Sequence, residues 1–333
     1  MGYNPDRQTE DKKQQYYLQQ EKNVSRAKIT VVGAGNVGAN AAQIAASKGL
    51  GDVVLIDIVE GLPNGKALDM AQLKGVYASA GNVVGTTNWD VAADSDIVIV
   101  TSGLPRKPGM SRDDLLAKNA GIVKSVTEQI VRTSPNSFII VVCNPLDVMT
   151  HVTAKISGFD KNRVMGMAGA LDSARFACFV AEDLGVDIGD IQGVLMGGHG
   201  DSMVPLPRFT SVAGIPLPEL MSQDRIDAHV ERARKGGIEI VNLMGTSAYY
   251  APAAGAVKMA EAILNDSKSI MSCCAYCESE YNIGGAFVGV PVMLGAGGVE
   301  KVIELNLNDS EKSQLDTSVC HVKELVTVVE TMV

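Results

Sequence analysis

The chain has 333 residues, of which 46% are hydrophobic and 20% charged, and this composition excludes a wholly disordered protein. The formal net charge is −9 and there is no Lys/Arg run, so neither nucleic acid nor an anionic membrane surface is an expected partner. No apolar stretch reaches the roughly 18 residues that a membrane-spanning helix needs, and the length suits two domains.

Residues 1–26 precede the first predicted element. They lack the apolar stretch of a secretory signal, and they are too acidic for a transit peptide. We expect a mobile N-terminal extension. The alternative is an arm that docks on a neighbouring subunit through Tyr16, Tyr17 and Leu18.

The cysteine pattern predicts neither a disulfide framework nor a metal site. Cys274 and Cys277 form a C-x-x-C pair, but no second pair and no nearby histidine accompanies it. We expect free thiols in a reducing compartment, and therefore a cytoplasmic protein. The six cysteines are Cys143, Cys178, Cys273, Cys274, Cys277 and Cys320.

The first half alternates short apolar strands with longer helical segments. Predicted strands cover 28–33, 52–57, 96–101 and 137–142, and predicted helices cover 35–49, 64–78 and 113–132. Continuously apolar strands between helices indicate a parallel sheet that is buried on both faces. The sequence therefore predicts a doubly wound α/β Rossmann domain over residues 27–165.

The second half reads as an α+β domain over residues 166–333. Helical patterns cover 172–185, 224–244, 248–264 and 309–331, and apolar or strand-like runs cover 191–197, 203–215, 269–276, 286–294 and 299–305. We expect this half to carry the substrate and the catalytic groups.

A glycine-rich motif joins the first predicted strand to the first helix. Asp57 lies about 20 residues after the motif, at the end of the next strand, and this combination is typical of a dinucleotide site. The helix N-terminus suits a pyrophosphate, and the Asp57 carboxylate favours NAD over NADP because it would repel a 2′-phosphate. The motif consists of Gly33, Ala34, Gly35, Asn36, Val37 and Gly38.

Three further segments carry candidate chemistry. Arg106 and Arg112 lie in a Pro/Gly-punctuated loop and could each bind a carboxylate, although a solvated basic loop is an open alternative. Asp172 and Arg175 share one helix face, which also suits a simple ion pair. His199 lies among glycines, and Asp172 is available to fix its tautomer for general base catalysis.

From about residue 28 to the C-terminus the chain resembles the lactate/malate dehydrogenase family, in its lactate-dehydrogenase-like malate dehydrogenase branch. The motifs are G-A-G-N-V-G (33–38), L-P-R-K-P-G-M-S-R-D-D-L (104–115), C-N-P-L-D (143–147), L-D-S-A-R-F (171–176), G-G-H-G-D (197–201), S-A-Y-Y-A-P-A-A (247–254) and F-V-G-V-P-V (287–292). The segment M-G-T-S-A-Y-Y (244–250) is one residue shorter than the family pattern.

The resemblance implies reversible NAD-dependent oxidation of (S)-malate to oxaloacetate, a step of the tricarboxylic acid cycle. It implies that His199 is the general base held by Asp172, that Arg175 binds the substrate's 1-carboxylate, and that Arg112 stabilises charge on the reacting oxygen. It also places Asn144 against the substrate and the nicotinamide.

The resemblance further implies that Arg106 selects the substrate and that Asn119, Val142 and Asn144 contact NAD. An arginine at position 106 favours a dicarboxylate, because a monocarboxylate would leave the cation unpaired in a closed site. Two alternatives stay open: a lactate or other 2-hydroxy-acid dehydrogenase, and a silent NAD-binding protein. Family members assemble into dimers and tetramers, so we expect a homo-oligomer, with a tetramer favoured.

Overall fold

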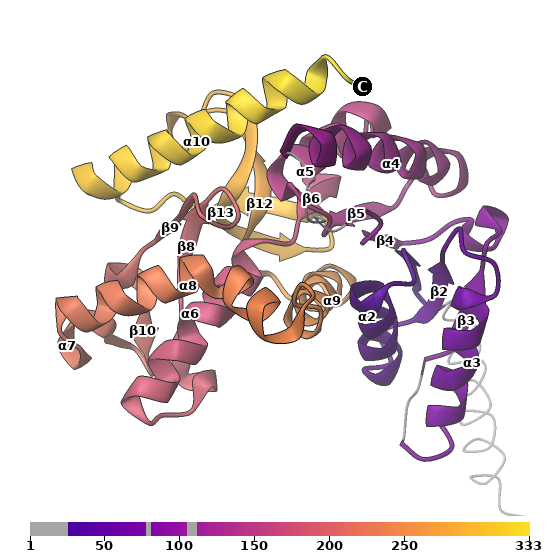
Figure 1. Ribbon diagram of the computed structural model, residues 1–333, viewed down its shortest axis with the longest axis horizontal. Helices are drawn as coiled ribbons and strands as arrows, with labels where there is room; N and C mark the ends of the chain where they lie inside the picture. The colour runs from indigo at the N-terminus through magenta and orange to yellow at the C-terminus, as the bar shows by residue number, and fades with distance from the viewer. Residues whose placement is uncertain (1–25, 78–80, 105–111) are drawn as a thin grey trace, which may run out of the picture.

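Six parallel strands form the first half of a large sheet. The computed structural model describes residues 26–77, 81–104 and 112–333. In spatial order the strands are β3 (Val83–Thr86), β2 (Asp52–Ile56), β1 (Lys28–Val32), β4 (Ile97–Val100), β5 (Phe138–Val141) and β6 (Val164–Gly166). The helices of this half are α2 (Asn36–Ser47), α3 (Leu62–Leu73), α4 (Arg112–Thr133) and α5 (Leu146–Ser157). The chain builds the sheet outward from β1 to β3 on one side and from β4 to β6 on the other, which confirms the predicted doubly wound α/β fold. Figure 1 labels β2 to β6 of these strands.

Helices cover both faces of this sheet because alternate residues of each strand point to opposite sides. In β4, Ile97 and Ile99 pack in a cluster that includes α2 and a later helix, α9 (Tyr250–Leu264). Val98 and Val100 pack instead against α4 and α5. Both faces are therefore apolar, which is why the strands read as continuous hydrophobic runs.

The second half continues the same sheet with antiparallel strands. After β6 the order is β12 (Ser269–Cys277), β13 (Ala286–Gly295), β8 (Leu195–Gly197) and β9 (Met203–Pro205), and β14 (Gly298–Val302) also pairs with β13. A small second sheet contains β11 (Ile215–Pro216), β10 (Ser211–Val212) and β7 (Ile191–Gln192). The predicted domain boundary after residue 165 lies within β6, so the two predicted domains share one sheet.

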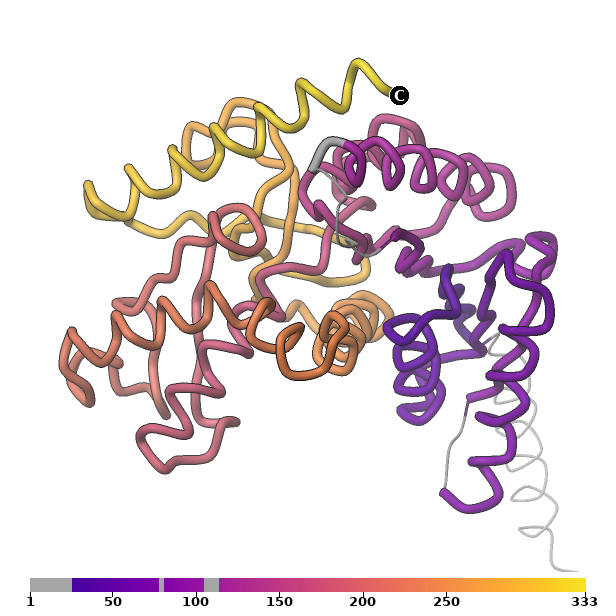
Figure 2. Tube along the Cα trace, viewed as in Figure 1, coloured from indigo at the N-terminus to yellow at the C-terminus, as the bar shows by residue number. Residues whose placement is uncertain are grey.

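Further α-helices belong to this half. They are α6 (Gly169–Leu184), α7 (Leu217–Leu220), α8 (Gln223–Met244) and α10 (Asp309–Glu330). Short 3₁₀ helices are η1 (Trp89–Ala92), η2 (Lys161–Arg163), η3 (Ile188–Asp190), η4 (Pro207–Phe209) and η5 (Glu280–Asn282). Figure 2 shows α8 running past α6, and α10 beside α5.

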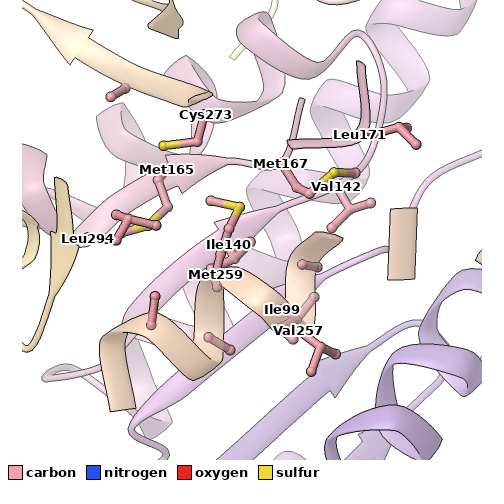
Figure 3. Close-up of a cluster of buried hydrophobic side chains, with 14 of the residues drawn as sticks. Ile99, Ile140, Val142, Met165, Met167, Leu171, Val257, Met259, Cys273 and Leu294 are labelled. Carbon is pink, nitrogen blue, oxygen red and sulfur yellow. The ribbon is translucent and has the colours of Figure 1, made fainter. Parts of the chain in front are cut away.

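One hydrophobic cluster crosses from the first half to the second. It contains side chains of β4, β5 and β6 together with side chains of α9, β12 and β13. Figure 3 shows part of it, with Ile99, Ile140, Val142, Met165, Met167, Leu171, Val257, Met259, Cys273 and Leu294 labelled. The shared core places the end of β5 next to the loop after β8.

Two strands and one α-helix of the first half were not predicted from the sequence, namely β3, β6 and α5. α5 is rich in β-branched residues, which are weak helix formers, and it still runs from Leu146 to a left-handed Gly158 at its C-cap. The predicted helix over 64–78 ends at Leu73. Residues 1–25 of the predicted extension lie outside the described residues. Within the described ranges, no helix is long and apolar enough to cross a membrane.

Candidate active site

The glycine-rich loop between β1 and α2 combines two tight contacts with one open position. A Cβ on Gly38 would lie 1.8 Å from the carbonyl oxygen of Gly33, and a Cβ on Gly33, whose φ is +103°, would lie 2.7 Å from Thr101 Oγ1. A Cβ on Gly35 would meet no atom within 4 Å. Two glycines thus permit close packing of helix and strand, and Gly35 leaves room beside the N-terminus of α2.

The carboxylate of Asp57 lies at the rim of this loop. Its Oδ2 accepts the backbone N–H of Ala34 at 2.6 Å, and its Oδ1 accepts that of Val59 at 3.0 Å. Asn36 begins α2 and Val37 follows it, and no side chain caps this helix N-terminus. The uncapped N-terminus of α2 and the free space at Gly35 suit a pyrophosphate. The Asp57 carboxylate suits the ribose of a dinucleotide.

Matched alanine substitutions in this loop test the assignment. Gly38→Ala is expected to destabilise the fold by about 1–3 kcal/mol, because the new Cβ overlaps a backbone oxygen that must move. Gly35→Ala is expected to keep the thermal midpoint and to weaken NADH binding, because its Cβ enters open space. Thermal unfolding and NADH fluorescence titration measure the two effects. A Gly38→Ala protein as stable as the wild type would contradict this interpretation.

His199 and Asp172 form a hydrogen-bonded pair, as the sequence predicts. Nδ1 of His199 lies 2.9 Å from Oδ2 of Asp172, which is on the first turn of α6 and almost fully buried. Oδ1 of the same carboxylate accepts a hydrogen bond from Nη1 of Arg175 at 3.1 Å. The helical ion pair and the His–Asp pair, considered as alternatives from the sequence, therefore coexist on one carboxylate.

The guanidinium of Arg175 is largely buried and incompletely paired. Its side chain is 13% exposed, and its Nε has no hydrogen-bond partner among the described residues. Gly236 of α8 makes room for it, since a Cβ there would lie 3.2 Å from Arg175 Cδ. A buried cation with an unused donor next to a histidine is suited to binding an anionic group.

Neighbouring charges favour the protonated form of His199. Burial lowers the pKa of the imidazole, but the charge and hydrogen bond of Asp172 and the charge of Asp147 raise it, and the charge of Arg175 opposes them. The net pKa of His199 is above its usual value of 6.5. An imidazole paired with a carboxylate in this way is suited to accept a proton from a bound substrate.

Asn144 follows β5 and faces the same region as His199. Both residues line a cavity of about 740 Å³ between α4, α5, α8 and α10, and Asn144 is exposed. The side chain of Asn119 is committed to the backbone, because it accepts the N–H of Leu104 and donates to the carbonyl oxygens of Leu104 and Asn144. Asn119 thus links the backbone of Leu104 to that of Asn144. Its contact with a cofactor stays a prediction. Val142, the residue that follows β5, is buried.

Sequence reasoning missed one residue of this cluster. Asp147 of α5 is buried, and its Oδ2 accepts the backbone N–H of His199 at 3.0 Å. It belongs to the C-N-P-L-D motif, but it lies in the first turn of α5, a helix that was not predicted. A carboxyl group inside a hydrophobic pattern was the signal that could have identified it.

The predicted substrate arginines of the loop are not placed. Arg106 lies outside the described residues, and Arg112 is the first residue of α4 with a side chain that is also outside them. Their roles stay predictions from the sequence.

The cysteines are free, and four of them are buried. Burial raises the pKa of both Cys143 and Cys277 to about 12, so neither thiol is activated as a nucleophile. In the part of the chain that the structure describes, no group of His, Cys, Asp and Glu side chains could hold a metal ion.

Both halves of the chain match one protein family. A family model described as lactate/malate dehydrogenase, NAD binding domain, matches residues 27–166, and the corresponding alpha/beta C-terminal domain matches 169–333. Malate dehydrogenase from Salinibacter ruber is 57% identical over 296 residues, covering 89% of this chain and 94% of that protein.

Two solved structures from one organism are equally similar in fold. The malate dehydrogenase of Cryptosporidium parvum has a TM-score of 0.89 and 43% identity, covering 92% of this chain and 99% of its own. The lactate dehydrogenase of the same organism, complexed with lactic acid and β-nicotinamide adenine dinucleotide, has a TM-score of 0.89 and 42% identity, with the same coverage. Fold similarity to solved structures therefore does not discriminate between the two substrates.

Proposed function

Because the chain belongs to the lactate/malate dehydrogenase family and catalyses the NAD-dependent malate dehydrogenase reaction, we propose a role for each residue of its site. The observation that carries the proposal is the buried Asp172 carboxylate, which holds His199 through one oxygen and Arg175 through the other. His199, a proton acceptor, and Arg175, an anion-binding cation, are thereby fixed next to each other.

His199 acts as the general base. Asp172 accepts the Nδ1–H of His199, which leaves Nε2 free to take the proton of the malate hydroxyl. NAD, when bound, supplies the carbon that accepts the hydride from the substrate. The imidazolium that forms is stabilised by the Asp172 carboxylate, and in the reverse direction it returns the proton to the oxygen of oxaloacetate.

Arginine side chains bind the substrate's two carboxylates. Arg175 has an unused Nε donor and binds the 1-carboxylate. Arg112 stabilises negative charge on the reacting oxygen, and Asn144, which lines the cavity with His199, orients the substrate. Arg106 binds the second carboxylate, and it rejects a monocarboxylate because an unpaired buried cation costs several kcal/mol.

The glycine-rich loop binds the dinucleotide. Gly33 to Gly38 surround the pyrophosphate at the start of α2, and Asp57 accepts hydrogen bonds from the adenosine ribose. The backbone of Val142 and Asn144 contacts the nicotinamide end of the cofactor, and Asn119 contacts the cofactor as well. Residues 27–165 would form the NAD-binding domain and residues 166–333 the catalytic domain.

A turnover comparison tests this proposal. Oxaloacetate and pyruvate are each supplied with NADH and with NADPH, and the loss of absorbance is followed. We expect rapid oxidation of NADH by oxaloacetate, and much slower rates with pyruvate or with NADPH. Faster turnover of pyruvate would favour the alternative, a lactate dehydrogenase, and absence of turnover would favour a silent NAD-binding protein.

The raised pKa of His199 predicts opposite pH profiles in the two directions. Malate oxidation needs the neutral imidazole, so its kcat/KM is expected to fall as the pH decreases through a pKa above 6.5. Oxaloacetate reduction needs the imidazolium, so its kcat/KM is expected to fall as the pH rises through the same value. Asp172→Asn should move both inflections to lower pH. Parallel profiles in the two directions would contradict the role of His199.

We also propose a cytoplasmic homo-oligomer, with a tetramer favoured, that serves the tricarboxylic acid cycle. Large apolar side chains are exposed on two helices, Leu68 on α3 and Ile238, Leu243 and Met244 on α8, and association would remove them from water. The four buried free thiols are consistent with a reducing compartment. Light scattering measures the assembly, and a monomer would contradict the oligomer.

A further inference from the structure

We propose that Asp147 is a positioning residue that holds His199 from the backbone side with a charged carboxylate, while Asp172 holds it from the ring side. This inference rests on the proposed role of His199 as the general base. It adds a second carboxylate, from a different helix, to the site.

The contacts of Asp147 make it unusual among the buried residues. It is 6% exposed, and its Oδ2 accepts the N–H of His199 at 3.0 Å. Its Oδ1 is buried and has no partner among the described residues that meets hydrogen-bond geometry, although the weak donor thiol of Cys274 lies beside it. A carboxylate that keeps one oxygen without a strong partner is costly to bury, so fold stability alone does not account for it.

The charge of Asp147 acts on His199 together with that of Asp172. Both carboxylates raise the pKa of the imidazole, whereas Arg175 lowers it. Burial raises the pKa of Asp147 above its usual value, although the N–H and the charge of His199 act in the opposite direction. A positive charge on His199 therefore favours the ionised form of Asp147. Positive charge that develops on His199 during malate oxidation is therefore stabilised from two directions.

Other groups around this cluster belong to several elements. Cys274 of β12 faces Asp147, and burial holds the pKa of this thiol well above its usual range, so it stays neutral. Asp147 and His199 both line the cavity, and the other charged or titratable side chains that line it are Asp201, Arg234 of α8 and His321 of α10. Asp147 is thus the second carboxylate, after Asp172, that acts on the pKa of His199.

The loop that carries His199 has a second anchor that is uncharged. Ser318 of α10 accepts the N–H of Gly198 at 2.8 Å and donates to the carbonyl oxygen of Ser202 at 2.7 Å. Asp147 and Ser318 therefore hold the same loop, one with a charge and one without. Substitutions of the two residues separate the effect of charge from the effect of loop geometry.

The experiment compares Asp147→Asn with Ser318→Ala. In Asp147→Asn the amide oxygen can still accept the His199 N–H, and the NH₂ group faces the Cys274 sulfur, so shape and the anchoring bond are kept while the charge is lost. The chain has only four histidines, so ring signals of ¹³C-labelled histidine can be assigned by substitution and titrated without substrate or cofactor.

We expect the pKa of His199 to fall by about one unit in Asp147→Asn, as expected for loss of a nearby partly buried charge. In Ser318→Ala we expect it to stay at the wild-type value. The kcat for malate oxidation should fall about tenfold in Asp147→Asn with little change in KM. Asp147→Ser also lacks the charge. If circular dichroism shows that the asparagine variant does not fold, the pKa of His199 is measured in the serine variant instead.

Two results would overturn the inference. One is an unchanged pKa of His199 in the folded Asp147 variants, which would leave the residue with a structural role only. The other is an equal shift in Ser318→Ala, which would assign the effect to loop geometry. Since the titration needs no turnover, a normal titration with no malate oxidation would instead count against the proposed function.

Discussion

Replacing His199 with alanine is expected to lower kcat for malate oxidation by about 10⁴-fold, because general acid–base catalysis by a positioned side chain contributes up to that factor. The variant keeps the glycine-rich loop and Arg175, so NADH binding should be close to that of the wild type. Stopped-flow measurement of NADH formation and fluorescence titration of NADH test the two statements separately.

His229 provides a matched control for this substitution. Its Nε2 lies 2.7 Å from Oδ2 of Asp183, so it is also a histidine paired with an aspartate, but it does not line the cavity. His229→Ala should therefore leave kcat unchanged. If His199→Ala kept activity within tenfold of the wild type, another group would have to be the proton acceptor.

Replacing Arg106 with glutamine is expected to lower kcat/KM for oxaloacetate by about 10³–10⁴-fold and to raise it for pyruvate. Loss of the guanidinium leaves the second carboxylate of oxaloacetate without its partner, and a mismatch of buried polar groups can produce discrimination of about 10⁴. The measurement is kcat/KM for both ketoacids with NADH.

Lys107 is the control for Arg106, because it is a neighbouring cation of the same segment. Lys107→Gln should leave the ratio of the two kcat/KM values as it is in the wild type. An Arg106→Gln enzyme that still prefers oxaloacetate by the wild-type ratio would refute the specificity argument.

The sequence predicts the parts of this molecule whose signals are local. The continuous apolar runs of β1, β2, β4 and β5 mark a sheet covered on both faces, and these strands lie where they were predicted. The glycine spacing in the loop after β1 also indicates close packing, since a Cβ on Gly38 would lie 1.8 Å from the carbonyl oxygen of Gly33.

Two contacts between distant elements could not be predicted in the same way, although the His199–Asp172 pair was. The Asp147 bond to the His199 backbone joins α5 to a loop 52 residues later, and the apolar pattern of α5 conceals the carboxylate. Likewise, the sequence does not reveal that the Asn119 amide bonds to the backbone of Leu104 and Asn144. Its predicted contact with a cofactor stays a prediction. Side-chain amides satisfy whichever backbone groups the fold leaves open, and spacing does not reveal these groups.

The pairing of β6 with β12 limits how far the two halves can be treated as interchangeable modules. A gene fragment encoding the nucleotide-binding half alone would present β6 as a bare strand edge, with unpaired N–H and C=O groups next to apolar surface. Such edges recruit other chains and lead to aggregation. Transplanting this half into a chimeric enzyme would therefore require a donor strand that replaces β12.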